Sequence, residues 1–421
     1  MKNSRIIVVV VSLVAMGLGW NIFATAAISQ DLQRTPIVLL ASEVLPKSLL
    51  TGPNYRIKDM VINDGMINTY ELDTNYGPLK VESTALLLKR INEIRAISKI
   101  EQLKGTDVYV KALTQAGMAP IRTAEGLVLD PVGTVTGVAS GIGRFFHNAS
   151  SSLTGSSPYK DNIANSLLGQ SSYKREFAHQ FDVDPYTSYE PLQKALNDLS
   201  WTATAGGLTV KAALTAIPGA AVAVVSYTST AGSFKALVNE KTPSQLAEIN
   251  RNKLYSMGVP DPVVQVFMQN TYFNPWEQTL LVGELANMTG VKNTKVFIER
   301  AIGASEDSVA VFLRVRAQLI GLYQEKTKSV ASFVDANGFP FMMTSNGVVV
   351  GIFPLDYIAW TAGFARNEGV VSSAIKQMQG VTGKELWITG TVDLVARKAL
   401  EDRGWKVKDK FEDQVFMKMG H

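Results

Sequence analysis

The stretch from Ser172 to Phe234 constrains the fold most, because it joins a charged segment to a long run of small, uncharged residues. The charged part, from Tyr173 to Asp184, is predicted to be a short helix that stops before Pro185, whose ring disfavours helical backbone at the preceding residue. Between Lys211 and Lys235 there are 23 residues without a charge, rich in Ala, Gly, Thr and Val. Side chains this small allow helices to approach one another closely. We therefore expect tightly packed helices at this point of the fold.

The uncharged run has enough residues to span a bilayer, but its sequence favours burial inside the protein. Pro218-Gly219 interrupts it, and Thr, Ser and Tyr227 make its second half polar. We predict a buried helical hairpin that bends at Pro218-Gly219. A leucine at Ala220 or Ala223 should then overpack the interior. Contact of this run with a membrane is the alternative.

A second segment rich in glycine extends from Gly126 to Asn148. Gly133, Gly137 and Gly141 are four residues apart, so in a helix they would line one face. Such a face suits close helix packing or insertion at a lipid interface. A glycine-rich loop and short helix across the protein's own core is the favoured interpretation, because each glycine weakens an isolated helix by about 1 kcal/mol.

The N-terminus has the pattern of a signal peptide. Lys2 and Arg5 precede an apolar region from Ile6 to Gly17, and Ala24-Thr25-Ala26 supplies the small residues of a cleavage site. We therefore predict that residues 1–26 are removed after Ala26, with an uncleaved anchor as the alternative. The chain contains no cysteine, so neither a disulfide nor a lipidated N-terminal cysteine is available. These features predict a bacterial periplasmic or secreted protein.

The balance of charged residues restricts the classes of partner that the chain is expected to bind. Without Lys2 and Arg5 the chain carries 39 basic and 37 acidic residues, and the basic ones are scattered. This balance disfavours nucleic acid as a partner. The chain is 46% hydrophobic and 19% charged, as globular proteins are, and its 421 residues suggest two or three packed units.

Residues 27–149 are predicted to form a small β-meander with helices and the Gly-rich segment. Extended runs between Tyr55 and Thr84 flank Asp64-Gly65, which is typical of a hairpin, and Gly77-Pro78 marks a second turn. From Ser83 the apolar residues recur with the spacing of a helix, which predicts a helix that reaches about Leu103. A second helix is predicted over 106–119.

Residues 150–172, dense in Ser, Gly and Asn, are predicted to be a linker, and residues 173–330 a helical domain. Thr242-Pro243 and Asn274-Pro275 are 32 residues apart, and each should begin a helix that a second helix follows. A third long helix is predicted from Ser305. This period is typical of stacked helical hairpins, which usually present a binding surface. An ordinary antiparallel bundle fits the pattern equally well.

Residues 331–421 are predicted to form a C-terminal α/β unit. Asn337-Gly338 and Asn346-Gly347 separate three extended runs, the strongest local signal for a β-meander. After a helix-prone region at 374–378, a strand–helix–strand unit over 385–407 should join the same sheet. The predicted fold is thus α+β and mainly helical, with β-rich ends.

The densest set of potential metal ligands is His179, Asp182 and Asp184, but a catalytic zinc would need a further His or Glu, and the chain has three histidines. Arg144 and His147 are further candidates for a polar site. Neither a Gly-x-Ser-x-Gly elbow nor a phosphate loop ending in Gly-Lys-Ser/Thr is present. We therefore predict no catalytic residue, metal or cofactor.

Three parts of the chain resemble an uncharacterised family of exported bacterial proteins. They are Asp130–Gly137 with Gly143–Phe146, the box Val183–Tyr186, and Leu386-Trp387 with Gly390 and Gly404-Trp405. The resemblance covers most of the mature chain and implies export. It brings no activity, cofactor or catalytic residue.

The resulting prediction is an exported, non-enzymatic structural or protein-interaction protein whose partner is an unidentified protein of the cell envelope. One alternative is a hydrolase acting on envelope material, with a polar pocket around Arg144, His147, His179 and Asp182. Another is a protein that contacts a membrane surface through its Gly/Ala-rich helices, including 212–234.

Overall fold

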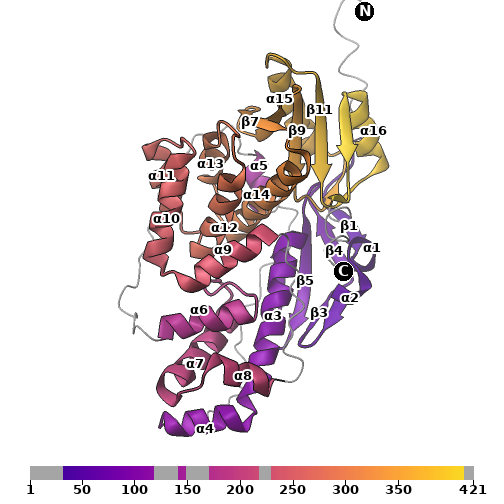
Figure 1. The fold of residues 1–421 in the computed structure, drawn as a ribbon. Helices are drawn as coiled ribbons and strands as arrows, with labels where there is room; N and C mark the ends of the chain where they lie inside the picture. The colour runs from indigo at the N-terminus through magenta and orange to yellow at the C-terminus, as the bar shows by residue number, and fades with distance from the viewer. Residues whose placement is uncertain (1–31, 118–140, 148–169, 218–228, 412–421) are drawn as a thin grey trace, which may run out of the picture.

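The computed structural model describes residues 32–117, 141–147, 170–217 and 229–411 (Figure 1). The fold is α+β and mainly helical, as predicted. An antiparallel sheet lies at the N-terminal end of the chain, helices occupy the middle, and a mixed sheet lies at the C-terminal end. The predicted bend at Pro218-Gly219, with Ala220 and Ala223, lies outside the described residues, as do Gly133 and Gly137.

The N-terminal sheet confirms the predicted meander. Its strand order is β1-β4-β5-β3-β2, and β6 pairs with the other edge of β5. Asp64 N–H donates to the Ile67 carbonyl at 3.2 Å in the first hairpin turn, where Gly65 has a φ of 104°. The strands are β1 (Ile37–Leu40), β2 (Thr51–Gly52), β3 (Tyr55–Ile57), β4 (Met60–Asn63), β5 (Asn68–Thr74) and β6 (Leu79–Glu82), with the short helices α1 (Ala41–Val44) and α2 (Lys47–Leu50) between β1 and β2.

Two helices follow this sheet. Helix α3 (Thr84–Lys104) begins where the Ser83 side chain accepts a hydrogen bond from Leu86 N–H. Helix α4 (Asp107–Gln115) is shorter than the predicted 106–119, because the chain leaves the helix at Gly117, which has a φ of 68°.

The helical part of the chain contains ten described helices. The prediction for residues 150–172 is wrong at its end, because α6 already begins at Gln170. The charged helix ends at Gln180 and not at Asp184, since Asp182 adopts a φ of 52°. The helices are α5 (Gly141–His147), α6 (Gln170–Gln180), α7 (Glu190–Gly206), α8 (Val210–Ala216), α9 (Ser229–Glu240), α10 (Pro243–Ser256), α11 (Asp261–Met268), α12 (Pro275–Asn287), α13 (Lys295–Ala301) and α14 (Asp307–Thr327).

The two predicted hairpins, α10–α11 and α12–α13, are present and lie side by side. Their first helices are capped by the side chains of Thr242 and Asn274, which accept from backbone N–H groups three residues on. Helix α10 packs on α12 and α11 packs on α13, but α12 also packs on α9 and α14. The pair of hairpins is therefore part of a bundle around α14, in which every residue from Ser308 to Ile320 is buried.

The C-terminal sheet has the order β13-β11-β9-β8-β7 and confirms both the meander and the strand–helix–strand unit that joins it. Strands β7, β8 and β9 are antiparallel, and β11 is parallel to β9 and to β13. Helix α15 is longer than the predicted 374–378, because Thr361 caps it early by accepting from Phe364 N–H. The elements are β7 (Val330–Asp335), β8 (Pro340–Thr344), β9 (Val348–Phe353), α15 (Ala362–Lys376), β11 (Gly383–Ile388), α16 (Leu394–Asp402) and β13 (Trp405–Lys408).

The two sheets are joined through the loop after β9. Met66 carbonyl accepts from the N–H groups of Asp356 and Tyr357, and Gly65 carbonyl accepts from Ala359 N–H. Beside this junction β10 (Tyr357–Ile358) pairs with β12 (Thr391–Val392). One large hydrophobic core runs through both sheets and the helices between them. Of the helices in the described parts of the chain, none has the length and apolar character needed to cross a membrane.

Candidate functional site

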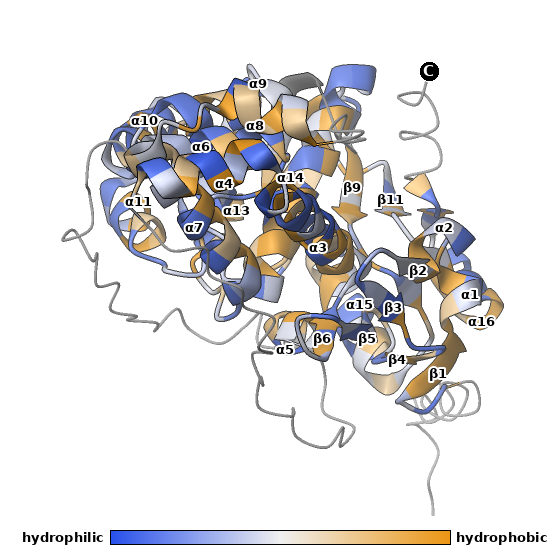
Figure 2. Cartoon of the chain, turned by 90° about the horizontal axis from the view of Figure 1, so that it is seen from below, coloured by the Kyte–Doolittle hydropathy of each residue, from blue (hydrophilic) through white to orange (hydrophobic). Residues whose placement is uncertain are grey.

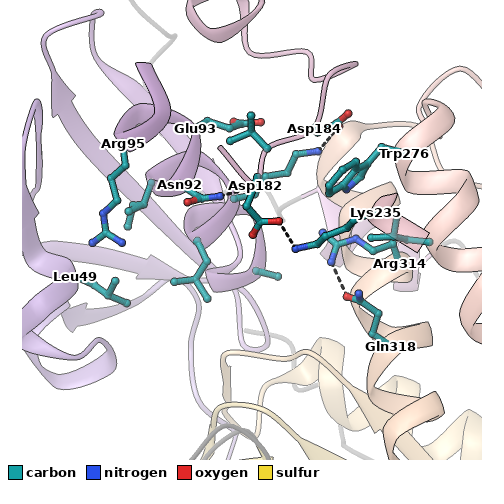
Figure 3. Close-up of a pocket in the computed structure, with 16 residues that line it drawn as sticks. Leu49, Asn92, Glu93, Arg95, Asp182, Asp184, Lys235, Trp276, Arg314 and Gln318 are labelled. Atoms are coloured by element: carbon teal, nitrogen blue, oxygen red, sulfur yellow. Dashed lines mark hydrogen bonds and ion pairs between the residues drawn. The ribbon is translucent and has the colours of Figure 1, made fainter. Parts of the chain in front are cut away.

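A cavity of about 120 Å³ lies where α3 meets the helical part of the protein (Figure 3). The loop after α6 contributes Asp182 and Asp184, and α9 contributes Lys235. Trp276 on α12 and Arg314 on α14 complete the side opposite α3. Polar side chains from parts of the chain far apart in sequence thus meet at one point.

A buried chain of charges forms one wall of this cavity. Lys89 Nζ on α3 lies 2.9 Å from Asp184 Oδ2 and 2.6 Å from Glu277 Oε1. The other oxygen of Glu277 accepts from Arg314 Nε at 2.8 Å. The side chains of Asp184 and Glu277 are 1% and 2% exposed. This chain of charges, which we call the Lys89 network, ties α3 to the loop after α6 and to α12 and α14.

Burial and ion pairing shift the pKa values of the residues in the Lys89 network in opposite directions. Burial alone would raise the pKa of Glu277, but the charges of Arg314 and Lys89 outweigh it and lower the pKa to about 2. For Asp184 burial prevails, so its pKa is raised despite the opposing charge of Lys89. Burial would lower the pKa of Lys89, but Asp184 and Glu277 raise it. Lys89 and Glu277 are therefore charged at neutral pH.

A second ion pair lies in the lining of the cavity. Lys235 Nζ lies 2.6 Å from Asp182 Oδ1, and the backbone carbonyl of Asp182 accepts from Asn92 Nδ2 at 2.6 Å. Lys235 also lies 5.9 Å from the ring centroid of Trp276. Figure 3 shows Asp182 and Lys235 pointing toward one another between α3 and the helices opposite. The left-handed backbone at Asp182 aims its side chain here.

Two of the three residues singled out as potential metal ligands have other partners. Asp182 and Asp184 each pair with a lysine, while His179 lies in the last turn of α6 and its backbone carbonyl accepts from Asp182 N–H. Within 32–117, 141–147, 170–217 and 229–411 no three His, Asp or Glu side chains are grouped to hold a metal ion.

Arg144 and His147 belong to a different region. Arg144, on α5, pairs with Glu306 at the start of α14. His147 is the last residue of α5, and its side chain is not among the described parts. Arg144 does not line the cavity around Asp182, so Arg144 and Asp182 are not brought into one pocket.

Sequence reasoning missed Lys89, Glu277 and Arg314. Only Arg314 carried a signal, because it interrupts the apolar run from Val309 to Ile320, where a charge must be buried and therefore paired. Lys89 and Glu277 occur in ordinary amphipathic patterns. Lys89 and Glu277 contact each other although they are 188 residues apart in the sequence, and no local pattern reveals such a contact.

The carboxylates of the site are neutralised by neighbouring lysine and arginine side chains. Each of the carboxylates of Asp182, Asp184 and Glu277 contacts a lysine or arginine, so the charges satisfy one another before any ligand arrives. Such an arrangement fixes the relative positions of helices. Compared with protein-family models, with curated proteins and with solved structures, the chain has no significant match.

Proposed function

We propose that the chain is an exported, non-enzymatic structural or protein-interaction protein of the bacterial cell envelope. The observation that carries this proposal is the pairing of the carboxylates of Asp182, Asp184 and Glu277 with lysine and arginine side chains. A general acid or base must exchange its proton with a substrate, and fixed opposite charges oppose that exchange because they hold the group in its charged form. In the Lys89 network, such an exchange would leave an uncompensated charge buried.

The export part of the proposal has the support of residues 1–26, which carry the pattern of a cleaved signal peptide. N-terminal sequencing of the protein recovered from the bacterial envelope should give a mature chain that starts at Ala27. Recovery of a chain that still begins at Met1 would contradict cleavage and favour an anchored protein.

An interaction role is supported by an exposed apolar face on the N-terminal sheet. Val38 and Leu40 on β1 are 59% and 50% exposed, and Met60, which pairs with Leu40 on β4, is 56% exposed. We call these three residues the β1–β4 apolar face. Figure 2 shows β1 as an apolar strand at the periphery of the fold. Neighbouring exposed apolar side chains of this kind mark interaction sites.

The surroundings of this face favour a protein over a lipid surface. Glu43 and Asp59 are exposed next to Leu40 and Met60, and their charges would be repelled by anionic lipid headgroups. Addition of a strand to the edge of β1 is hindered, because Pro36 has no N–H to offer and Leu40 N–H already donates to Glu43 at 3.4 Å. The partner should therefore contact the side chains of β1 and β4 and carry basic groups at its rim.

Site-specific photo-crosslinking in the envelope of living cells tests this proposal. A photoreactive residue at Met60 should yield one discrete crosslinked protein, and Val38→Ser with Leu40→Ser should abolish that product. Val266→Ser on α11 is the matched control, because Val266 is likewise exposed, at 42%, and lies elsewhere. Crosslinking to lipid alone would favour the membrane alternative. Hydrolysis of envelope material that Asp184→Asn abolishes would favour the hydrolase alternative.

A further inference from the structure

The start of α16 carries two exposed apolar side chains. Leu394, its first residue, is 84% exposed, more than any residue of the β1–β4 apolar face, and Val395 is 39% exposed. We call Leu394 and Val395 the α16 apolar tip. The Asp393 side chain caps the helix by accepting from Ala396 N–H, and Asp393 N–H donates to the Ile358 carbonyl. The fold therefore holds the tip in place at the surface.

The α16 apolar tip and the β1–β4 apolar face lie on the same side of the molecule. Figures 1 and 2 show α16, α1 and β1 along one edge of the fold in both views. The carbonyl of Tyr357 accepts from Asn63 Nδ2 of β4 at 3.4 Å, and its strand β10 pairs with β12, which directly precedes Asp393. Burial and the nearby charges of Asp393 and Glu43 raise the pKa of Tyr357. The two apolar surfaces are thus neighbours around Tyr357.

The charges beside the two surfaces are opposite. The β1–β4 apolar face has the exposed carboxylates of Glu43 and Asp59 next to it. One turn on from Leu394, Lys398 is 77% exposed, and the spacing of four residues places both on the same side of α16. Lys398 pairs with Asp402, but both side chains are exposed and such a pair is weak. The start of α16 thus combines apolar surface with a basic group, as the acidic surroundings of the face require.

We propose that the partner of the β1–β4 apolar face is a second copy of this chain, with the α16 apolar tip of each copy against that face of the other. The inference rests on the proposed role of this face in interaction. A two-fold axis makes both contacts at once, because each copy carries both surfaces on the same side, and the result is a closed dimer. The contact is made by side chains, so it does not need the edge of β1, where Pro36 hinders pairing.

Analytical ultracentrifugation of the purified protein tests the proposal. The wild type should sediment as a dimer. Leu394→Ser should weaken dimerisation by about 100-fold, because the two-fold axis removes this contact twice. Val266→Ser on α11 is the matched control, since Val266 is also exposed, at 42%, and should leave the dimer intact. Leu394 is so exposed that its substitution should not unfold the protein.

Engineered cysteines identify the contact, because the chain contains no cysteine of its own. Leu394→Cys and Met60→Cys are mixed and oxidised, with a tag on one variant that changes its mass. A disulfide-linked dimer with one copy of each variant is expected. Leu394→Cys mixed with Val266→Cys is the control and should stay unlinked. The proposal is overturned if the wild type is a monomer, if Leu394→Ser stays fully dimeric, or if the first mixture links no more than the control.

Photo-crosslinking from Met60 in the cell envelope separates this inference from the proposed function. A product made of two copies of the chain supports both. A product with a different protein supports an interaction role for the β1–β4 apolar face and overturns the second copy as its partner. If no protein is linked, the interaction role and the dimer are both contradicted.

Discussion

The carboxylate of Asp356 accepts a hydrogen bond from the backbone N–H of Asn68, 2.8 Å away and 288 residues earlier in the chain. Its other oxygen accepts from Thr84 N–H at 3.0 Å. Asn68 is the first residue of β5 and Thr84 the first of α3, so one buried side chain fixes the start of both elements. Asp356 thereby orients α3, the helix that carries Lys89, relative to the C-terminal sheet.

The burial of Asp356 makes the free energy of unfolding depend on pH. Burial raises the pKa of Asp356 from 3.8 to about 6, although hydrogen bonds from Asn68 and Thr84 oppose the shift. The folded state then holds more protons than the unfolded state between these values, so stability from this group falls as pH rises through that window. A shift of this size corresponds to at most about 3 kcal/mol.

Urea unfolding of the wild type and of Asp356→Asn, measured from pH 4 to pH 7, checks this expectation. The wild type should lose stability relative to Asp356→Asn as pH rises, because asparagine cannot titrate. The comparison removes the contribution of all other titrating groups that the two proteins share. A difference between them that does not change with pH would show that Asp356 keeps an ordinary pKa.

Loss of the charge on Lys89 should destabilise the fold strongly. Lys89→Met keeps an unbranched side chain of nearly the same length but leaves Asp184 buried with only the neutral donors Asn274 Nδ2 and Tyr186 N–H. Removing one member of a buried ion pair typically costs about 3–5 kcal/mol. The free energy of unfolding in urea at neutral pH is the measurement.

Lys398→Met is the control for this experiment. Lys398 lies 2.7 Å from Asp402, but the two side chains are 77% and 61% exposed. An exposed pair contributes about 0–1 kcal/mol. If the two methionine variants lose equal stability, the Lys89 network does not hold the helices together as its geometry indicates.

We expect the purified protein to contain no tightly bound transition metal. A metal ion at Asp182 and Asp184 would first have to displace Lys235 and Lys89 from their carboxylates. Elemental analysis of protein prepared without chelator should find well under one equivalent of zinc, iron or manganese. One equivalent of a metal that disappears in His179→Ala would refute this prediction.

Local chemistry explains which parts of the fold could be predicted from the sequence. Asn337-Gly338 forms its hairpin because both residues take positive φ, and Thr242 and Asn274 cap helices with their own side chains. These signals lie within a few residues of the structure they determine. The same reasoning gave the meanders, the two helical hairpins and the unit that completes the C-terminal sheet.

The candidate site could not be predicted in this way. Asp182 and Asp184 stood out because they are close in sequence to His179, but their partners Lys235 and Lys89 are 53 and 95 residues away. Charged residues are common on helices, and only the packing of α3 against α12 shows that Lys89 is buried with Glu277. Long-range pairing of this kind leaves no periodic trace in the sequence.

The small residues of α7 provide a test of close helix packing. Gly206, the last residue of α7, lies against α4, and a Cβ at this position would be 2.0 Å from the carbonyl oxygen of Ala112. Figure 1 shows α4 and α7 side by side. Gly206→Ala should therefore force the helices apart and lower the free energy of unfolding by about 1–3 kcal/mol.

Gly369→Ala should have the opposite effect. Gly369 lies within α15, and nothing surrounds its Cβ position within 4 Å among the described residues. Alanine is favoured over glycine in a helix by about 1 kcal/mol, so this variant should melt at a higher temperature than the wild type. Thermal unfolding of both variants measures the two effects under the same conditions. If Gly206→Ala also raises the melting temperature, α4 and α7 are not in close contact at Ala112, and small residues at this point serve no packing purpose.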